Sequence, residues 1–309
     1  MPAEYTHQLI CERVYAGLPE RIRQKIRVRS AYFWGAQGAD VMYFLRMKKK
    51  PNYGYFLHNR DVYEVFCSFC ERAEDKDPDA ISYMAGYITH YAADCIFHPY
   101  VYALTARLAG QEPQRRIRWH AYIESDLDTY FVESRAKTEV GKYQNPMRGE
   151  RVDLTKIAPL LREVCRARGL QDFSERALRR AVWGYLLFER AFTDRKYRKR
   201  TLVSGVERVL HLPQVCSVLF RRRQIDARVK NSDRQTWSNL SDDRFLSEEN
   251  ADDLFERAVR EGIRLLCVFF DAAENKTPLL REDFGRGYLS GIDSRLPFVR
   301  PSRPSKKNP

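Results

Sequence analysis

Apolar and polar positions repeat along the chain with the period of an α-helix. In residues 61–73, for example, Val62, Val65, Phe66 and Phe69 are three or four positions apart, which places them on one helical face. Comparable patterns predict helices at 5–17, 20–29, 79–98, 119–137, 154–168, 174–193, 200–210, 213–230 and 248–274. Alternation with a period of two is nowhere sustained. The sequence therefore predicts an all-α fold, a single multi-helix domain packed around a polar cleft.

The predicted helix 79–98 contains three potential metal ligands, and Pro99 is expected to end or kink it. His90, Asp94 and His98 recur every fourth residue, so they stack on one helical face. Imidazole and carboxylate are ligand types that zinc selects. A buried Asp between two histidines needs a partner or a metal, because an isolated buried charge is costly. A core helix with hydrogen-bonded histidines and a capping Asp explains the pattern equally well.

A second pair of candidates lies further along the chain. His120 and Glu124 are also four residues apart, although such pairs are common on solvated helices. Three more polar residues lie near apolar or aromatic segments upstream: His7, Asp40 and His58. His211 has no acidic or histidine neighbour at ligand spacing, so we interpret it as structural. Two constellations in one chain favour a metal site.

The chain has 309 residues and a formal net charge of +13, which is concentrated in residues 194–234 and 300–309. Solvated helix faces explain most of this charge. We expect Arg221, Arg222 and Arg223 to form a peripheral contact with an anionic membrane, with nucleic acid as the weaker alternative. The seven cysteines are scattered, which favours free thiols.

No stretch of about 18 apolar residues is present, so no transmembrane helix is predicted. The first residues lack the basic start and apolar core of a secretory leader, which favours a cytoplasmic location. We expect one helical domain at 1–296. Residues 297–309, rich in Pro, Ser, Lys and Asn, are expected to form a disordered basic tail.

The ordered set of motifs resembles the zinc-dependent phospholipase C family, an all-α fold with three zinc ions. Fungal single-strand-specific nucleases share that metal site. The resemblance is carried by Thr6-His7, Gly38-Ala39-Asp40, His58, His90-x-x-x-Asp94, His98-Pro99 and His120-x-x-x-Glu124. Residues 237–245 and 287–291 are similar to the cytoplasmic, bacterial branch. Ala39 is a departure, because the family usually has Pro there.

The resemblance implies that the polar cleft is a tri-metal cleft holding two to three zinc ions. The implied ligands of the first ion are Asp40, His58, His90 and Asp94, and those of the second are His98, His120 and Glu124. His7 is the implied ligand of a third ion, with Asp94 bridging and the amino group of the chain completing the set. Asp40 is also the implied catalytic residue, which orients the attacking water or takes its proton.

The expected function is therefore that of a metal-dependent phosphodiester hydrolase, with phospholipase C-like cleavage of a phospholipid headgroup by zinc-activated water. One alternative is a single-strand nuclease or other phosphoesterase on the same tri-zinc site. The other is a non-catalytic metal-binding protein that uses its helices for interaction.

Overall fold

The computed structural model describes residues 4–45, 52–59, 62–73, 77–110, 116–145, 147, 152–167, 169–170, 173–212 and 214–299. The amino group of the chain and most of the expected tail at 297–309 lie outside these residues. Within them the predicted all-α class is confirmed, as a single domain. The elements are α1 (Glu4–Gly17), α2 (Glu20–Arg23), α3 (Arg29–Gly35), η1 (Gly38–Phe44), α4 (Tyr53–Asn59), α5 (Tyr63–Arg72), α6 (Pro78–Ala109), α7 (Arg116–Arg135), α8 (Leu154–Ala167), α9 (Glu175–Phe192), α10 (Arg198–Val209), η4 (Ser217–Leu219), η5 (Ala227–Lys230), β1 (Trp237–Asn239), β2 (Asp242–Ser247), α11 (Ala251–Asn275) and α12 (Arg281–Phe284).

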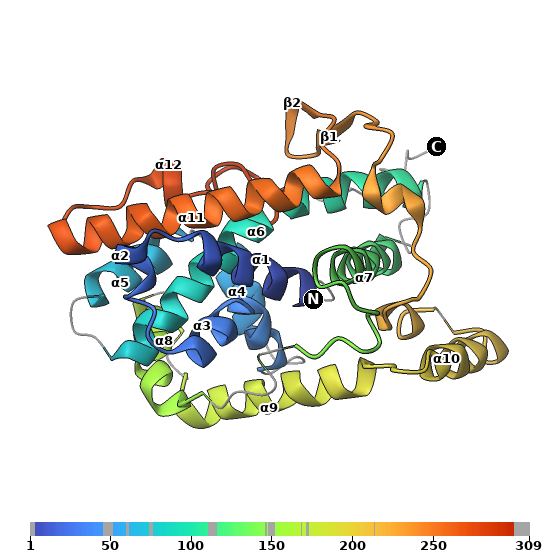
Figure 1. Cartoon of the computed structure of the whole chain (residues 1–309), viewed down its shortest axis with the longest axis horizontal. Coiled ribbons are helices and arrows are strands. Elements are labelled where there is room, and N and C mark those ends of the chain that lie inside the picture. The colour runs from blue at the N-terminus through green and yellow to red at the C-terminus, as the bar shows by residue number, and fades with distance from the viewer. Residues whose placement is uncertain are drawn as a thin grey trace, which may run out of the picture.

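Helix α6 is the central element, and α1, α3, α7, α8 and α11 all pack against it. Its 32 residues extend for about 48 Å. Most of its side chains are buried around its whole circumference, as expected of a helix without a polar face. Figure 1 shows α11 along one edge of the molecule and α9 along the other, with α1, α3, α4 and α6 between them.

The start of α6 follows simple capping rules, and its end does not. The carboxylate of Asp77 accepts a hydrogen bond from the backbone N–H of Asp79, and Pro78 occupies the first turn. The predicted end at Pro99 is wrong, because the helix continues to Ala109. Pro99 has no N–H to donate to the carbonyl of Cys95, and the loop at Gly291 packs closely against that carbonyl. Tertiary packing thus supports the helix where the local rule predicts a break.

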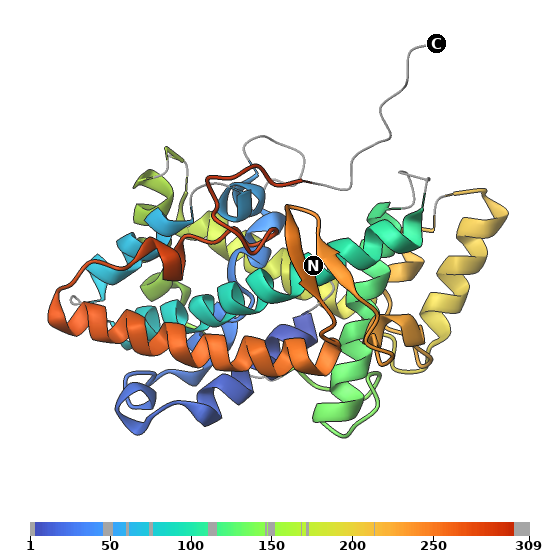
Figure 2. The ribbon, with the colours of Figure 1, turned by 90° about the horizontal axis from the view of Figure 1, so that it is seen from above.

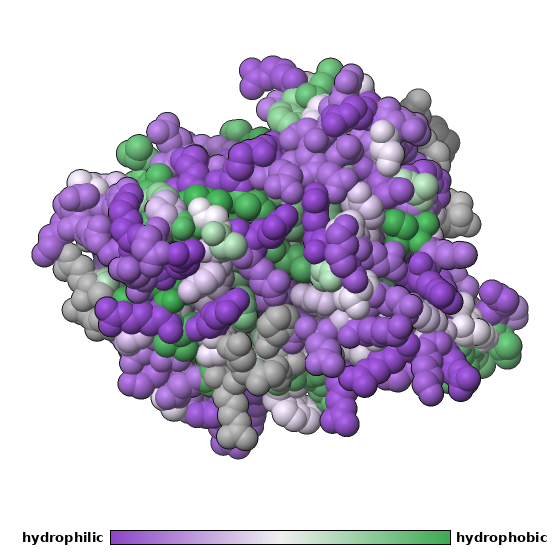
Figure 3. All heavy atoms as spheres, viewed as in Figure 1, coloured by the Kyte–Doolittle hydropathy of each residue, from purple (hydrophilic) through white to green (hydrophobic). Residues whose placement is uncertain are grey.

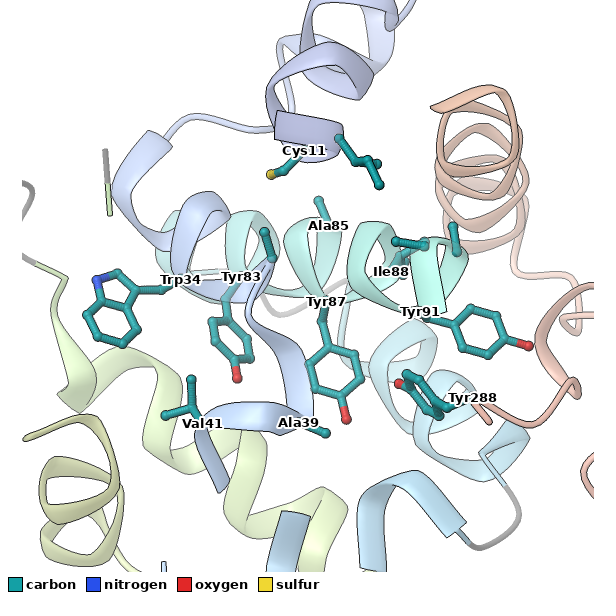
Figure 4. Close-up of a cluster of buried hydrophobic side chains, with 14 of the residues drawn as sticks. Cys11, Trp34, Ala39, Val41, Tyr83, Ala85, Tyr87, Ile88, Tyr91 and Tyr288 are labelled. Atoms are coloured by element: carbon teal, nitrogen blue, oxygen red, sulfur yellow. The ribbon is translucent and has the colours of Figure 1, made fainter. Parts of the chain in front are cut away.

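Aromatic rings fill the space on one side of α6. Tyr83, Tyr87 and Tyr91 project from successive turns, and Tyr288 lies beside the last two (Figure 4). The rings of Tyr91 and Tyr288 are 5.1 Å apart between centroids and stand nearly perpendicular. Two glycines allow α3 to approach α6 very closely. A Cβ on Gly35 would lie 2.2 Å from the carbonyl oxygen of Tyr83, and one on Gly86 would lie 2.0 Å from that of Tyr32.

Several predicted boundaries need correction. Residues 213–230 form no α-helix within the described part of that segment, where two short 3₁₀ turns, η4 and η5, stand in its place. The helix predicted at 20–29 is the single turn α2, followed by the separate helix α3. Residues 237–247 form an antiparallel hairpin, which the search for strand periodicity missed. Figure 2 shows α6 and α11 running side by side, with α10 at the far end of the molecule. None of the described helices is long and apolar enough to cross a bilayer.

Candidate metal centre

Five elements bring the eight predicted ligands together. α1 contributes His7, η1 contributes Asp40, α4 contributes His58, α6 contributes His90, Asp94 and His98, and α7 contributes His120 and Glu124. In three groups, one ligand atom from each member lies within 4.8 Å of the others. These groups are His7 with Asp40 and His90, His58 with His90 and Asp94, and His98 with His120 and Glu124.

Asp94 lies among four imidazole rings and divides its two carboxylate oxygens between them. Its Oδ1 lies 3.2 Å from Nε2 of His7 and 3.6 Å from Nδ1 of His98. Its Oδ2 lies 3.3 Å from Nε2 of His90 and 3.7 Å from Nε2 of His58. The α6 histidines reach Asp94 because positions four residues apart share a helical face. A carboxylate in this position can bridge two metal ions.

Glu124 is the second carboxylate of the site with histidines around it. Its Oε1 lies 3.2 Å from Nε2 of His120, one turn earlier on α7. The same oxygen lies 3.7 Å from Nε2 of His98 on α6. His98 therefore stands between the two carboxylates, and the packing of α7 on α6 joins the two sequence constellations.

Asp40 and His58 join the site from η1 and α4, and the chain turns tightly just before Asp40. Nε2 of His58 lies 3.2 Å from the Oδ1 of Asp40. Gly38, two residues earlier, has φ +50°, and a Cβ there would lie 2.2 Å from Cδ2 of His90. Glycine is therefore required for this turn to pass beside the His90 ring.

Backbone carbonyls orient two of the imidazoles. Nδ1 of His58 lies 2.7 Å from the carbonyl oxygen of Gly54, and Nδ1 of His98 lies 2.9 Å from that of Tyr288. In the neutral form of the ring, the form that binds a metal, a proton donated from Nδ1 leaves Nε2 unprotonated and available as a ligand. The Tyr288 contact was missed as a functional feature. The only signal for it was the family-like segment 287–291, which gave no hint of a backbone role.

The pKa values of the site residues are set by burial and by the close approach of carboxylates to imidazoles. Burial would raise the pKa of Asp94, but His98, His90 and His7 outweigh burial and hold this pKa far below its usual range. Burial lowers the pKa of His90 to about 3, although Asp94 opposes the shift. For His98, burial acts downward, but Asp94 and Glu124 dominate and raise its pKa to about 9. The carboxylates are therefore held in their charged, ligating form.

The unpaired atoms and the donor set fit a bound metal. Among the described residues, Nε2 of His90 and Oδ2 of Asp94 are fully buried and lie 3.3 Å apart, but they form no hydrogen bond with each other or with any other group. Buried polar atoms without partners are rare because they are costly, and a divalent cation would satisfy both. A cavity of about 20 Å³ between α1, α6 and α7 is large enough for one water-sized group; His7, Asp94, His98 and Glu124 form part of its lining, and the rest is mostly apolar. Larger surface hollows lie elsewhere, and their linings include none of the eight residues.

The exposed fraction differs among the eight predicted ligands. His120 has 22% of its side chain exposed, the largest fraction among the eight residues. His90, Asp94 and Glu124 are at most 5% exposed.

The predicted membrane contact of Arg221, Arg222 and Arg223 is wrong for the first two residues. Arg221 is buried under the start of α1, where its guanidinium lies among three carboxylates and 3.9 Å from the ring centroid of Tyr5. Arg222 pairs with the buried carboxylate of Asp126. Of the three, only Arg223 is exposed. The run of arginines serves mainly to neutralise acids inside the fold.

Comparison with known protein families gives a match over the part of the chain that contains the predicted ligands. A family model for zinc-dependent phospholipase C matches residues 6–167, which include all eight predicted ligands. Searches of curated proteins and of solved structures found no match. The resemblance inferred from the motifs is confirmed. The chain belongs to the zinc-dependent phospholipase C family.

Proposed function

We propose that the protein is a zinc-dependent hydrolase that cleaves a phosphodiester, namely the headgroup bond of a phospholipid. The observation that carries this proposal is the position of Asp94. Its two buried oxygens each face two imidazoles, at 3.2–3.7 Å. A carboxylate shared in this way supports a site with more than one ion, as expected for phosphodiester chemistry.

The three groups of ligands support two to three zinc ions. His98, His120 and Glu124 would hold one ion. Asp40, His58, His90 and Asp94, the set that the family resemblance implies, would hold another; His58, His90 and Asp94 form one group, and Asp40 lies 3.2 Å from His58. His7 would hold a third together with Asp94, whose Oδ1 lies 3.2 Å from Nε2 of His7. When bound, zinc would lower the pKa of a coordinated water to about 7 and neutralise charge on the phosphodiester.

The protein groups would position the reactants around the ions. The carbonyls of Gly54 and Tyr288 would keep His58 and His98 in the tautomer that ligates through Nε2. The Asp40 carboxylate is 14% exposed, unlike the nearly enclosed Asp94. It could therefore accept a hydrogen bond from the attacking water and orient that water toward phosphorus. The ring of His120, the least buried of the eight, would mark the side from which the substrate enters.

A phosphodiester panel tests this function. The purified protein, loaded with zinc, would be assayed against phosphatidylcholine, phosphatidylinositol, bis-nitrophenyl phosphate and single-stranded DNA. We expect release of a phosphorylated headgroup from at least one phospholipid at a higher kcat/KM than cleavage of DNA. Preferred cleavage of single-stranded DNA would instead identify a nuclease. Full zinc content without turnover of any diester would favour the non-catalytic alternative.

A further inference from the structure

The outer helix α10 exposes apolar side chains along one face. Leu202, Val206 and Val209 are four and three residues apart, so they lie on the same side of the helix. Leu202 is 70% exposed, Val206 50% and Val209 76%. The apolar surface continues beyond the helix. We define the α10 patch by its six exposed aliphatic residues, Leu202, Val206, Val209, Leu210, Leu212 and Val215.

The α10 patch is unusual because its members are close together. Isolated exposed leucines and valines are normal on a protein surface, but a contiguous cluster rimmed by polar residues marks an interaction site. Figure 3 shows apolar atoms over α10 at the outer end of the molecule, bordered by hydrophilic atoms. Within the described residues, α10 makes its main packing contacts with the short turn η4. Helix α10 is therefore a projecting element with an uncovered apolar face.

The charged groups around the patch are almost all cationic. The exposed side chains just before and within α10 include Arg195, Lys196, Arg198, Lys199 and Arg208. Several of them also line an open surface hollow of about 460 Å³.

The two acids of this segment, Asp194 and Glu207, are buried. Asp194 accepts hydrogen bonds from the backbone N–H groups of Arg198 and Arg200, and Glu207 accepts one from that of Cys216. Their carboxylates are thus turned inward, so the outer surface combines aliphatic side chains with positive charge. An exposed helix with this combination is typical of segments that lie in the interface of an anionic membrane.

A hydrogen bond links the loop after α10 to the start of α7, the helix that carries His120 and Glu124. The side chain of Gln214, in the loop after α10, accepts a 2.7 Å hydrogen bond from Nη2 of Arg118 on α7. Arg118 is two residues before His120, the most exposed of the predicted ligands. Ile117, beside Arg118, is 75% exposed. Arg118 and His120 point to different faces of α7, but both lie in its first two turns, so a surface that binds the α10 patch would contact the same end of this helix.

We propose that the α10 patch docks the protein on a membrane containing anionic phospholipid. The aliphatic side chains would enter the headgroup region, and the neighbouring cations would bind lipid phosphates. Nucleic acid is a poorer fit, because α10 carries no aromatic side chain on which a base could stack. The inference rests on the proposed phospholipid substrate, which explains why the protein would need a lipid surface. Its test measures binding separately from hydrolysis.

The test uses the zinc-loaded full chain and sedimentation with two kinds of vesicle, phosphatidylcholine alone and phosphatidylcholine with one-fifth phosphatidylserine. We expect tighter binding to the anionic vesicles. Binding should weaken in 0.5 M salt, because the Debye screening length becomes shorter. The double variant Leu202→Gln/Val209→Gln should lower the partition coefficient by about tenfold or more. Arg195→Gln and Lys196→Gln should each lower it about fivefold.

Leu246→Gln on β2 is the matched control, since Leu246 is 66% exposed but lies on the hairpin, away from α10. This control should bind vesicles as the wild type does. All variants should hydrolyse soluble bis-nitrophenyl phosphate at the wild-type rate, while the α10 variants lose hydrolysis of vesicle lipid.

The docking proposal and the proposed function fail in different ways. Soluble diester turnover without vesicle binding would overturn the docking proposal and leave the enzyme intact. Equal binding to both kinds of vesicle would also overturn the docking proposal. So would a loss of vesicle binding in Leu246→Gln as large as that in the α10 variants, or binding to single-stranded DNA without binding to vesicles. Vesicle binding that depends on the α10 patch, without turnover of any diester, would support docking and refute the enzymatic function.

Discussion

Replacing Arg221 with Met should destabilise the protein by about 3–5 kcal/mol at neutral pH, the usual cost of breaking a buried ion pair by removing one partner. The guanidinium of Arg221, 7% exposed, donates to Asp128 through Nε at 3.1 Å and Nη2 at 2.8 Å. Nη2 also lies 3.3 Å from Glu4, and Nη1 lies 3.4 Å from Glu189. Met fills part of the volume of the arginine stem but leaves three buried carboxylates without their shared cation.

The loss should be smaller in acid. Burial raises the pKa of Asp128 and Glu189 even in the wild type, where Arg221 acts against the shift. Without Arg221 these pKa values should rise further above the value of about 4 expected for the unfolded chain. Between the unfolded and folded pKa values, the folded state then binds more protons. Its stability therefore falls as pH rises through that window and recovers as pH falls.

Urea denaturation followed by circular dichroism, at pH 7.5 and pH 5.5, measures both effects. Arg223→Met is the matched control, because Arg223 belongs to the same arginine run but is exposed. Its unfolding free energy should change by no more than about 0.5 kcal/mol. Arg221→Met should also bind zinc more weakly, since Glu4 lies one turn before His7 on α1. The reasoning is refuted if Arg221→Met loses no more stability than Arg223→Met, or if its defect grows at pH 5.5.

Three further predictions concern the metal centre. Gly38→Ala should lower the free energy of unfolding by about 2–4 kcal/mol and weaken zinc binding, because its Cβ would collide with His90 at a residue with positive φ. Gly205→Ala in α10 is the control and should not destabilise the protein, because open space surrounds this glycine. Urea denaturation of both variants measures the difference. Asp94→Asn should abolish turnover and lower zinc content at more than one position, while His211→Ala should change neither, as elemental analysis and diester assays would show. Chelation should lower the melting temperature of the zinc-loaded protein, because a metal bound only to the folded state stabilises it; an unchanged melting curve would contradict this.

Local spacing was sufficient to predict the ligands that share a helix. His90, Asp94 and His98 were expected on one face because they are four residues apart, and α6 places them there. His7, Asp40 and His58 carry no such local signal. They join the group through contacts between α1, η1, α4 and α6, which span long sequence separations. Their grouping could be anticipated only from the family resemblance, and the ligand roles of all eight residues stay predictions.

The errors arose where long-range packing decides the structure. A run of three arginines has the composition of a solvated surface, and the sequence gives no indication that Arg221 and Arg222 face buried acids on other helices. Those inward contacts replace the predicted helix at 213–230 by turns. The break expected at Pro99 failed for a related reason. The loop at Gly291 packs against the turn from which Pro99 removes a hydrogen bond.

The described residues beyond the family match include none of the predicted ligands. They nevertheless make contacts that orient the ligands of the candidate metal centre. The match ends at residue 167, after all eight candidates. Yet the carbonyl that receives Nδ1 of His98 belongs to Tyr288, and the cation that holds the start of α1 belongs to Arg221. The side chain of Asn239 on β1 in turn donates to the carbonyl of Ser290, which links the hairpin to the loop carrying Tyr288. Contacts of this kind set ring orientation and ligand basicity, and their loss typically lowers metal affinity by about 10–100-fold. Because two of these three contacts use backbone carbonyls, which every residue possesses, no pattern of side chains along the sequence could have identified them.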